Sequence, residues 1–174
     1  DAVLSQSSNT TAGRVYLTVL NNEREGKYKG GTVQVIPNVT EEILRRMLLS
    51  TEESKADVII TEIGGTVGDI ESLPFIECIR QMKYEVGEEN CCYIHLTLLP
   101  YMKKAHEIKT KPTQHSVKEL QELGIQPDIL MLRTEVELDE ATKDRLALFC
   151  NVDKDCVIQN TTAKSIYEVP LNME

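Results

Sequence analysis

The chain has 174 residues, 41% of them apolar and 27% charged, which is ordinary for a soluble globular protein with one sizeable domain. Its formal net charge is −9, whereas a general nucleic-acid-binding protein would carry a basic surface, so we expect no nucleic-acid partner. No apolar run approaches the roughly 20 residues that span a bilayer, so we expect no membrane association. The five cysteines form an odd set without metal-binding spacing, which indicates reduced thiols and a cytoplasmic protein.

The first half of the chain predicts two helices and two strands. Apolar residues at helical spacing predict helices over 14–24 and 39–49. β-Branched residues predict a short strand over 32–36, which Pro37 ends. A continuous apolar segment over 56–63 is typical of a strand that is buried on both faces of a parallel sheet.

In the second half of the chain, predicted helices alternate with predicted strands. The predicted elements are helices over 73–86, 115–123 and 141–150, strands over 91–98, 129–132 and 156–159, and a lysine-bearing loop over 100–112. Ser72 stands where the first of these helices would be capped, and Pro74 fits its first turn. Strands that alternate with helices predict an α/β fold, in which a parallel sheet is flanked by helices and joined by right-handed crossovers.

The most informative segment begins where the predicted strand over 56–63 ends. Glu62 lies at that end, three glycines follow within a few residues, and Asp69 and Glu71 precede the next helix. Glycines let the backbone approach a ligand closely, and open parallel sheets bind ligands beyond the carboxyl ends of their strands. Because Mg²⁺ takes one or two carboxylates together with phosphate oxygens, we expect Glu62 to bind Mg²⁺ that is also bound by a polyphosphate. The alternative is a surface turn with incidental acids.

A second candidate segment runs from Lys109 to Gln114. Lys109 and Lys111 precede a predicted helix, and a helix N-terminus offers free N–H groups and a positive dipole to a phosphate. Thr110 and Thr113 add hydroxyl donors. The alternative is a solvated loop, since two lysines in ten residues are common.

Three other positions give weaker indications. The spacing around Arg145 favours a solvated helix face, and His95 lies in a predicted strand, where a structural role is favoured. The Gly26-Lys27 pair is followed by Tyr28, so the sequence has no standard P-loop.

These segments together resemble the signature sequences of CTP synthases. The similarity covers 62–75, 109–120 and 124–129, with further matches at 32–37, 95–101 and 149–152, all in the family's order. It implies a deviant P-loop NTPase architecture of the dethiobiotin-synthetase type, in which residues 1–174 form the larger, later part of the synthetase (amidoligase) domain. We expect a fragment, because the family's N-terminal phosphate-binding loop and its C-terminal glutaminase domain are missing from this sequence.

The resemblance also implies an activity. The family makes CTP from UTP: ATP, with Mg²⁺, phosphorylates the uracil 4-oxygen, and ammonia then displaces the phosphate. The ammonia comes from glutamine that the glutaminase domain hydrolyses, and CTP acts as a feedback inhibitor. The resemblance further implies a homotetramer and filaments. These 174 residues alone are expected to be inactive.

Individual site residues follow from the same resemblance. Glu62 is the expected Mg²⁺ ligand, and Lys109 and Lys111 are the expected catalytic residues. The residues expected to contact UTP or CTP are Asp69, Ile70, Glu71, Lys109, Thr110, Lys111, Pro112, Thr113, Gln114 and Arg145. Those expected to contact ATP are Thr161, Thr162 and Ala163. Arg145 stands where the family usually has lysine, and the two side chains are not interchangeable.

Two other functions stay open at this point. Another ATP-dependent ligase of the dethiobiotin-synthetase type would explain the sheet and Glu62, but not the full segment from Lys109 to Gln114. A non-catalytic nucleotide-sensing or assembly module would keep binding surfaces without the chemistry.

Overall fold

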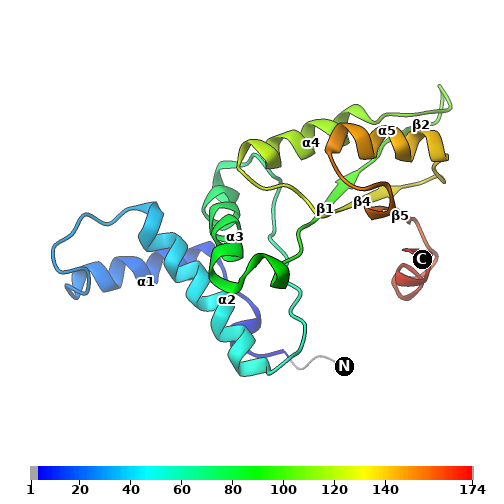
Figure 1. Ribbon diagram of the computed structural model, residues 1–174. Coiled ribbons are helices and arrows are strands. Elements are labelled where there is room, and N and C mark those ends of the chain that lie inside the picture. Colours follow the sequence, from blue (N-terminus) through cyan, green and yellow to red (C-terminus); the bar gives the residue numbers. More distant parts are fainter. Residues whose placement is uncertain (1–3, 174) are drawn as a thin grey trace. The chain divides into compact units, whose positions relative to one another are not determined.

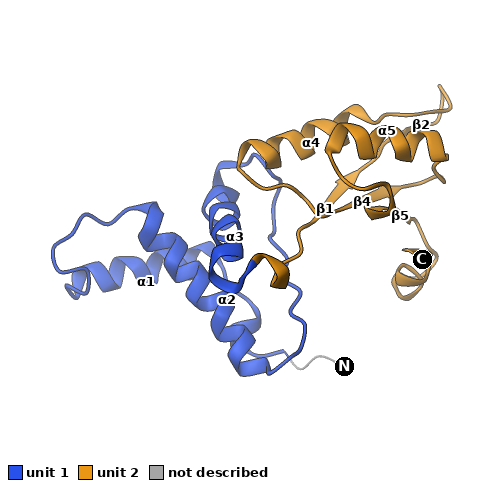
Figure 2. Cartoon of the chain, viewed as in Figure 1, with its two compact units in different colours: residues 1–87 blue, residues 88–174 orange. Residues whose placement is uncertain are grey.

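The computed structural model describes residues 4–173, and the chain divides into two compact units, Asp1–Gly87 and Glu88–Glu174 (Figures 1 and 2). Within the described range, no helix combines the length and the apolar character needed to cross a membrane.

The first unit is helical in its described part. Its helices are α1 (Ala12–Arg24), α2 (Thr40–Ser54) and α3 (Leu73–Val86), accompanied by the short turns η1 (Gln6–Ser8), η2 (Val35–Val39) and η3 (Ile70–Ser72). The helices predicted over 14–24, 39–49 and 73–86 are confirmed. The Thr11 hydroxyl accepts the Arg14 N–H and so caps α1. A small core joins α1, α2 and α3, and it contains the buried side chains of Val15, Val19, Val39, Ile43 and Cys78.

The strands predicted over 32–36 and 56–63 are wrong. Residues 31–34 are irregular, and Val35–Val39 forms a kinked turn in which Ile36 keeps extended backbone angles. The Gln34 N–H donates to Asn38 Oδ1 at 2.8 Å across this turn. The segment 56–63 also has no regular structure, and Val58 and Ile60 are 76% and 91% exposed. A strand needs a neighbouring strand to take its backbone hydrogen bonds, and the described part of this unit contains none.

The second unit holds a parallel sheet in the order β1-β4-β5. Its strands are β1 (Ile94–Leu98), β4 (Ile129–Thr134) and β5 (Val157–Thr161), with helices α4 (Lys111–Glu122) and α5 (Glu140–Cys150) and a short antiparallel pair, β2 (Tyr101–Met102) and β3 (Glu107–Ile108). This arrangement confirms the predicted α/β fold with a parallel sheet and helices. The short β2–β3 pair lies within the predicted loop over 100–112.

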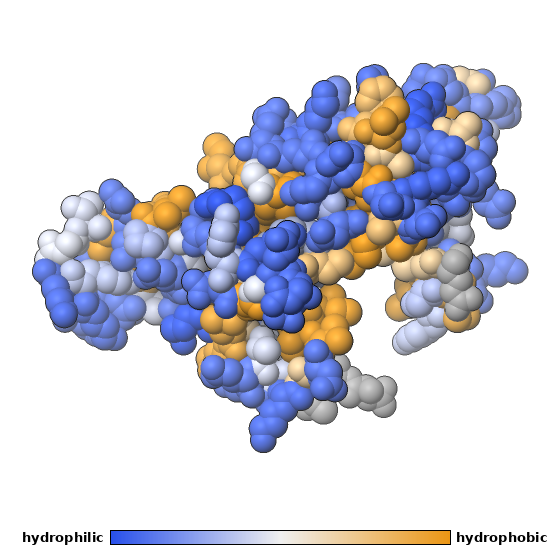
Figure 3. Space-filling view, viewed as in Figure 1, coloured by the Kyte–Doolittle hydropathy of each residue, from blue (hydrophilic) through white to orange (hydrophobic). Residues whose placement is uncertain are grey.

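The core of the second unit lies between the sheet and helices α4 and α5. Leu130 and Leu132 from β4 are fully buried, and they form one cluster with Val117 of α4 and Leu146 of α5. The opposite face of β1 carries Ile94, Leu96 and Leu98, each more than half exposed. The space-filling view shows other apolar residues exposed among the hydrophilic ones (Figure 3).

Candidate functional site

The carboxyl ends of three strands meet at one edge of the sheet in the second unit. Because β1, β4 and β5 are parallel, Leu98 pairs with Arg133 and Thr134 pairs with Thr161 at this edge. The segment that contains Lys109 follows β1, and Thr162 and Ala163 follow β5 directly. The Thr162 N–H donates to the Thr134 carbonyl at 3.3 Å, which continues the pairing by one residue. The sheet therefore positions two of the predicted ligand-contact segments at its carboxyl edge.

Thr113 fastens the first turn of α4 to the end of β1. Its hydroxyl donates to the Leu98 carbonyl at 3.3 Å and accepts from the Thr97 hydroxyl at 3.2 Å. Thr113 is fully buried and Gln114 is 5% exposed. Thr113 therefore holds the start of α4 against the end of β1.

Lys109 and Lys111 lie on either side of the start of this helix. The Lys109 N–H donates to the Pro100 carbonyl at 2.9 Å, and its ammonium group pairs with Glu107 at 2.6 Å in an exposed position. The predicted helix start at residue 115 was too late, because α4 begins at Lys111 and Pro112 occupies its first turn. Proline suits that position, since the first N–H groups of a helix have no partner inside it.

Lys111 also reaches the neighbouring helix. Its Nζ donates to Gln114 Oε1 at 3.1 Å and lies 5.5 Å from the centre of the Phe149 ring on α5. Phe149 is 51% exposed, which is unusual for a large aromatic side chain. No role was predicted for Phe149 from the sequence, although its position four residues after Arg145 places both on one side of α5.

Arg145 is exposed on α5 and makes no ion pair within residues 4–173. Its positive charge interacts with the carboxylate of Asp139, which caps that helix. The pKa of Asp139 lies below its usual value, first because its carboxylate accepts the Thr142 N–H and, more weakly, because of the Arg145 charge. Arg145 therefore offers a cation on the helix that Lys111 contacts.

His95 has the structural role that the sequence favoured. It is buried in β1, and its Nε2 lies 2.9 Å from the Ser116 hydroxyl of α4. Burial lowers the pKa of His95, although its contact with Ser116 opposes that shift. The neutral imidazole joins β1 to α4.

The residues of the first unit that are expected to contact UTP or CTP lie on a turn. The Ser72 hydroxyl donates to the carbonyls of Thr66, at 3.1 Å, and Asp69, at 2.8 Å, so it closes the turn and makes no capping bond to α3. Gly65 and Gly68 have φ angles of 97° and 101°, which residues with a side chain rarely adopt. The turn leaves Asp69, Ile70 and Glu71 exposed.

Glu62 lies in the irregular segment before that turn and is exposed. Its carboxylate is a ligand type that Mg²⁺ prefers, and it makes no ion pair with any described residue. Nowhere in residues 4–173 do three or more His, Cys, Asp or Glu side chains come together in a metal-binding group. Since Mg²⁺ needs only one or two carboxylates when phosphate oxygens complete its shell, Glu62 fits that ion chemically.

Comparison with known proteins identifies one family and several relatives that resemble this chain over almost its whole length. The family described as CTP synthase N-terminus matches residues 1–174. The chain is 61% identical to the CTP synthase of Clostridium acetobutylicum over 171 residues, covering 98% of this chain and 32% of that protein. It is 59% identical to the CTP synthase of Treponema denticola over 174 residues, covering 100% of this chain and 32% of that protein. A Staphylococcus saprophyticus CTP synthase is 61% identical over 173 residues, covering 99% of this chain and 32% of that protein. The chain thus spans about a third of the length of these relatives.

Proposed function

Because this chain belongs to the CTP synthase family, we propose that it is part of the synthetase domain of an enzyme that converts UTP to CTP. The observation that carries the proposal is the position of Lys109 and Lys111, which lie at the start of α4 beyond the carboxyl end of β1. Ligands of parallel sheets bind at that edge, and lysines beside free helix N–H groups suit a phosphate.

The cations of this edge neutralise phosphate in the proposed reaction. Lys109 and Lys111 are the proposed catalytic residues, and Arg145 contacts the triphosphate of the pyrimidine nucleotide. Positive charge that is already in place stabilises the negative charge that develops during phosphoryl transfer. Lys111 is held by Gln114 and Phe149, which favours a fixed position over a freely moving one.

Polar groups near these cations complete the proposed contacts with UTP. Thr110, Pro112, Thr113 and Gln114 line the start of α4, and Thr110 accepts a hydrogen bond from the Gln114 amide at 3.4 Å. In the first unit, Asp69, Ile70 and Glu71 contact the same class of nucleotide, UTP or the inhibitor CTP. Their exposure on the turn closed by Ser72 supports this role.

ATP and its metal are assigned to other residues. Thr161, Thr162 and Ala163, at the end of β5, contact ATP in this proposal, and Glu62 holds Mg²⁺. When bound, the metal ion would polarise phosphoryl oxygens and neutralise their charge.

The complete reaction needs more than these residues supply. We propose that ATP phosphorylates the uracil 4-oxygen and that ammonia, released from glutamine by a glutaminase domain, displaces the phosphate. The functional form is a cytoplasmic homotetramer, and it also forms filaments. These 174 residues contain no standard P-loop, so by themselves they should bind nucleotide without turnover.

The test is UTP binding by the purified protein in the presence of Mg²⁺, measured by calorimetry. Lys109→Ala and Lys111→Ala should each weaken UTP binding about tenfold, because each removes a charge-assisted phosphate contact. Lys118→Ala, an exposed lysine further along α4, is the matched control and should bind as the unchanged protein does. Equal UTP affinity in all four proteins would contradict the proposal, and steady CTP formation by this chain alone would contradict its expected inactivity.

A further inference from the structure

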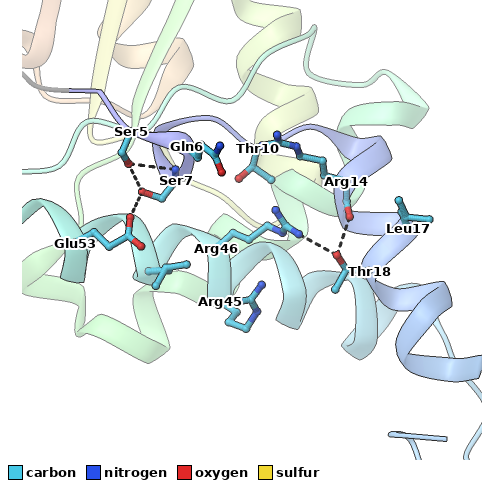
Figure 4. A pocket seen from close by; sticks show the side chains of 11 residues that line it. Ser5, Gln6, Ser7, Thr10, Arg14, Leu17, Thr18, Arg45, Arg46 and Glu53 are labelled. Carbon is cyan, nitrogen blue, oxygen red and sulfur yellow. Dashed lines mark hydrogen bonds between the residues drawn. The ribbon is translucent and has the colours of Figure 1, made fainter. Parts of the chain in front are cut away.

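A second candidate site lies in the first unit, and it contains none of the residues assigned to UTP, ATP or Mg²⁺. It is an open cavity of about 560 Å³ between η1, the start of α1 and residues 45–53 of α2 (Figure 4). Cavities of this size accommodate small organic molecules. Nothing in the proposed reaction uses it.

Three arginines line this cavity in a chain whose net charge is −9. Arg14 comes from α1, and Arg45 and Arg46 come from α2. One carboxylate of the lining, Glu53, accepts a hydrogen bond from the Ser7 hydroxyl. Arg45 and Arg46 share the carboxylate of Glu42, which lies outside the lining, so Arg14 supplies the positive charge of the lining that has no ion-pair partner among the described residues.

Arg46 is the most firmly held of the three arginines. Its Nε donates to Glu42 at 2.6 Å, its Nη2 donates to the Thr18 hydroxyl at 2.9 Å, and its side chain is 20% exposed. A guanidinium has five N–H donors, so these contacts leave others to face the cavity. The bond from Arg46 to Thr18 links α2 to α1 beside the cavity, and within α1 the Thr18 hydroxyl donates to the Arg14 carbonyl at 3.0 Å.

Arg14 lies in the first turn of α1 and has no ion-pair partner among residues 4–173. Arg46 has a carboxylate partner in Glu42, so Arg14 is the lining arginine that an anion bound in the cavity would supply with an ion pair. Figure 4 shows Arg14 and Arg46 on the two helices that border the cavity, with Ser5 and Ser7 on the η1 side. The Ser5 and Ser7 hydroxyls lie 2.6 Å apart and add polar hydrogen-bonding groups.

We propose that this cavity binds a small phosphate ester. Arg14 and Arg46 contact the phosphate, because guanidinium groups from two directions match its several oxygens better than they match a carboxylate. The organic part of the ester lies against Leu17 and Leu49, which supply the apolar lining.

The test uses inorganic phosphate and ribose 5-phosphate as probes, with binding measured by calorimetry on the complete chain. Arg14→Ala should weaken ribose 5-phosphate binding about tenfold or more, since it removes a charged hydrogen bond without breaking a contact of the fold. Arg14→Lys should recover part of that loss. Arg24→Ala is the matched control, because Arg24 is an exposed arginine in the last turn of the same helix and outside the cavity.

The outcomes separate this proposal from the proposed function. Tighter binding of ribose 5-phosphate than of inorganic phosphate, lost in Arg14→Ala and kept in Arg24→Ala, supports an ester site. No binding of either probe, or equal affinity in the two alanine variants, overturns it. Arg14→Ala should leave UTP binding unchanged, so failure at this cavity leaves the assignment of Lys109 and Lys111 untouched.

Discussion

The ammonium group of Lys111 lies 5.5 Å from the centre of the Phe149 ring, and this contact joins the first residue of α4 to the last turn of α5. The attraction comes from the negative face of the aromatic ring. It holds a proposed catalytic lysine at the carboxyl edge of the sheet.

This contact predicts an energetic coupling between the two residues. Lys111→Met and Phe149→Leu should each lower the free energy of unfolding by about 0.5 kcal/mol, the usual size of an exposed cation–π contact. The double variant should cost less than the sum of the two, as measured by urea denaturation, because the same contact is lost in each. Lys118→Met is the control on the same helix, and strictly additive losses would contradict the coupling.

The Thr113 hydroxyl predicts a difference between two conservative substitutions. Thr113→Val removes the hydrogen bonds to Leu98 and Thr97 while keeping the shape of the side chain, so it should lower the free energy of unfolding by about 1–3 kcal/mol. Thr113→Ser keeps the hydroxyl and should cost less. Thermal or urea unfolding measures both, and equal stability of the valine variant and the unchanged protein would refute the role given to this hydroxyl.

The ion pairs of Glu42 with Arg45 and Arg46 lead us to expect a loss of stability in acid. Its side chain is 7% exposed, and burial acts to raise its pKa, but hydrogen bonds from Arg45 and Arg46 outweigh burial and leave the pKa below the ordinary 4.5. A lowered pKa in the folded state contributes stability above the unfolded pKa, so this contribution disappears as the pH falls below 4.5. Glu42→Gln should cost about 2 kcal/mol at neutral pH and flatten the acid limb of the stability curve.

The exposed neighbour Glu41 provides the control for that experiment. Glu41→Gln should leave both the neutral stability and the acid limb close to those of the unchanged protein. If Glu41→Gln and Glu42→Gln gave the same profile from acid to neutral pH, the ion pairs of Glu42 could not be the source of the acid sensitivity.

The cysteines should differ in reactivity. Burial raises the pKa of Cys78 to about 12, with a smaller contribution from the Glu77 charge, and burial alone raises that of Cys150 to about 11. The thiolate is the reactive form, so both should resist iodoacetamide in the native protein at about pH 8, whereas exposed Cys92 should react. Mass spectrometry of the alkylated native and denatured protein checks this, and early labelling of Cys78 would contradict its burial.

The sequence predicted best those elements whose determinants lie within the element itself. Helix α3 has the predicted bounds, Leu73–Val86, because its apolar residues recur at helical spacing and Pro74 favours a helix start. The segment 56–63 shows the opposite case. Its residues favour a strand, but strand formation depends on hydrogen bonds to another segment, and the described part of that unit supplies none.

The candidate sites also contain features that the sequence predicted and features that it did not. The composition of residues 109–114 was enough to predict a phosphate-binding segment, whereas the burial of Thr113 and the contact of Lys111 with Phe149 were not predictable from spacing. The cavity beside Arg14 and Arg46 was not predicted at all, since these residues are far apart in the sequence and no local pattern joins them.

Residue identity and short-range spacing were thus enough to predict the family, the helices and the residues that could carry phosphate chemistry. The folded chain was needed to show which apolar segment forms a strand, which hydroxyl holds α4, and which arginines share a cavity. Those outcomes depend on contacts between distant segments, whose hydrogen bonds and buried surfaces exist only once the chain has folded.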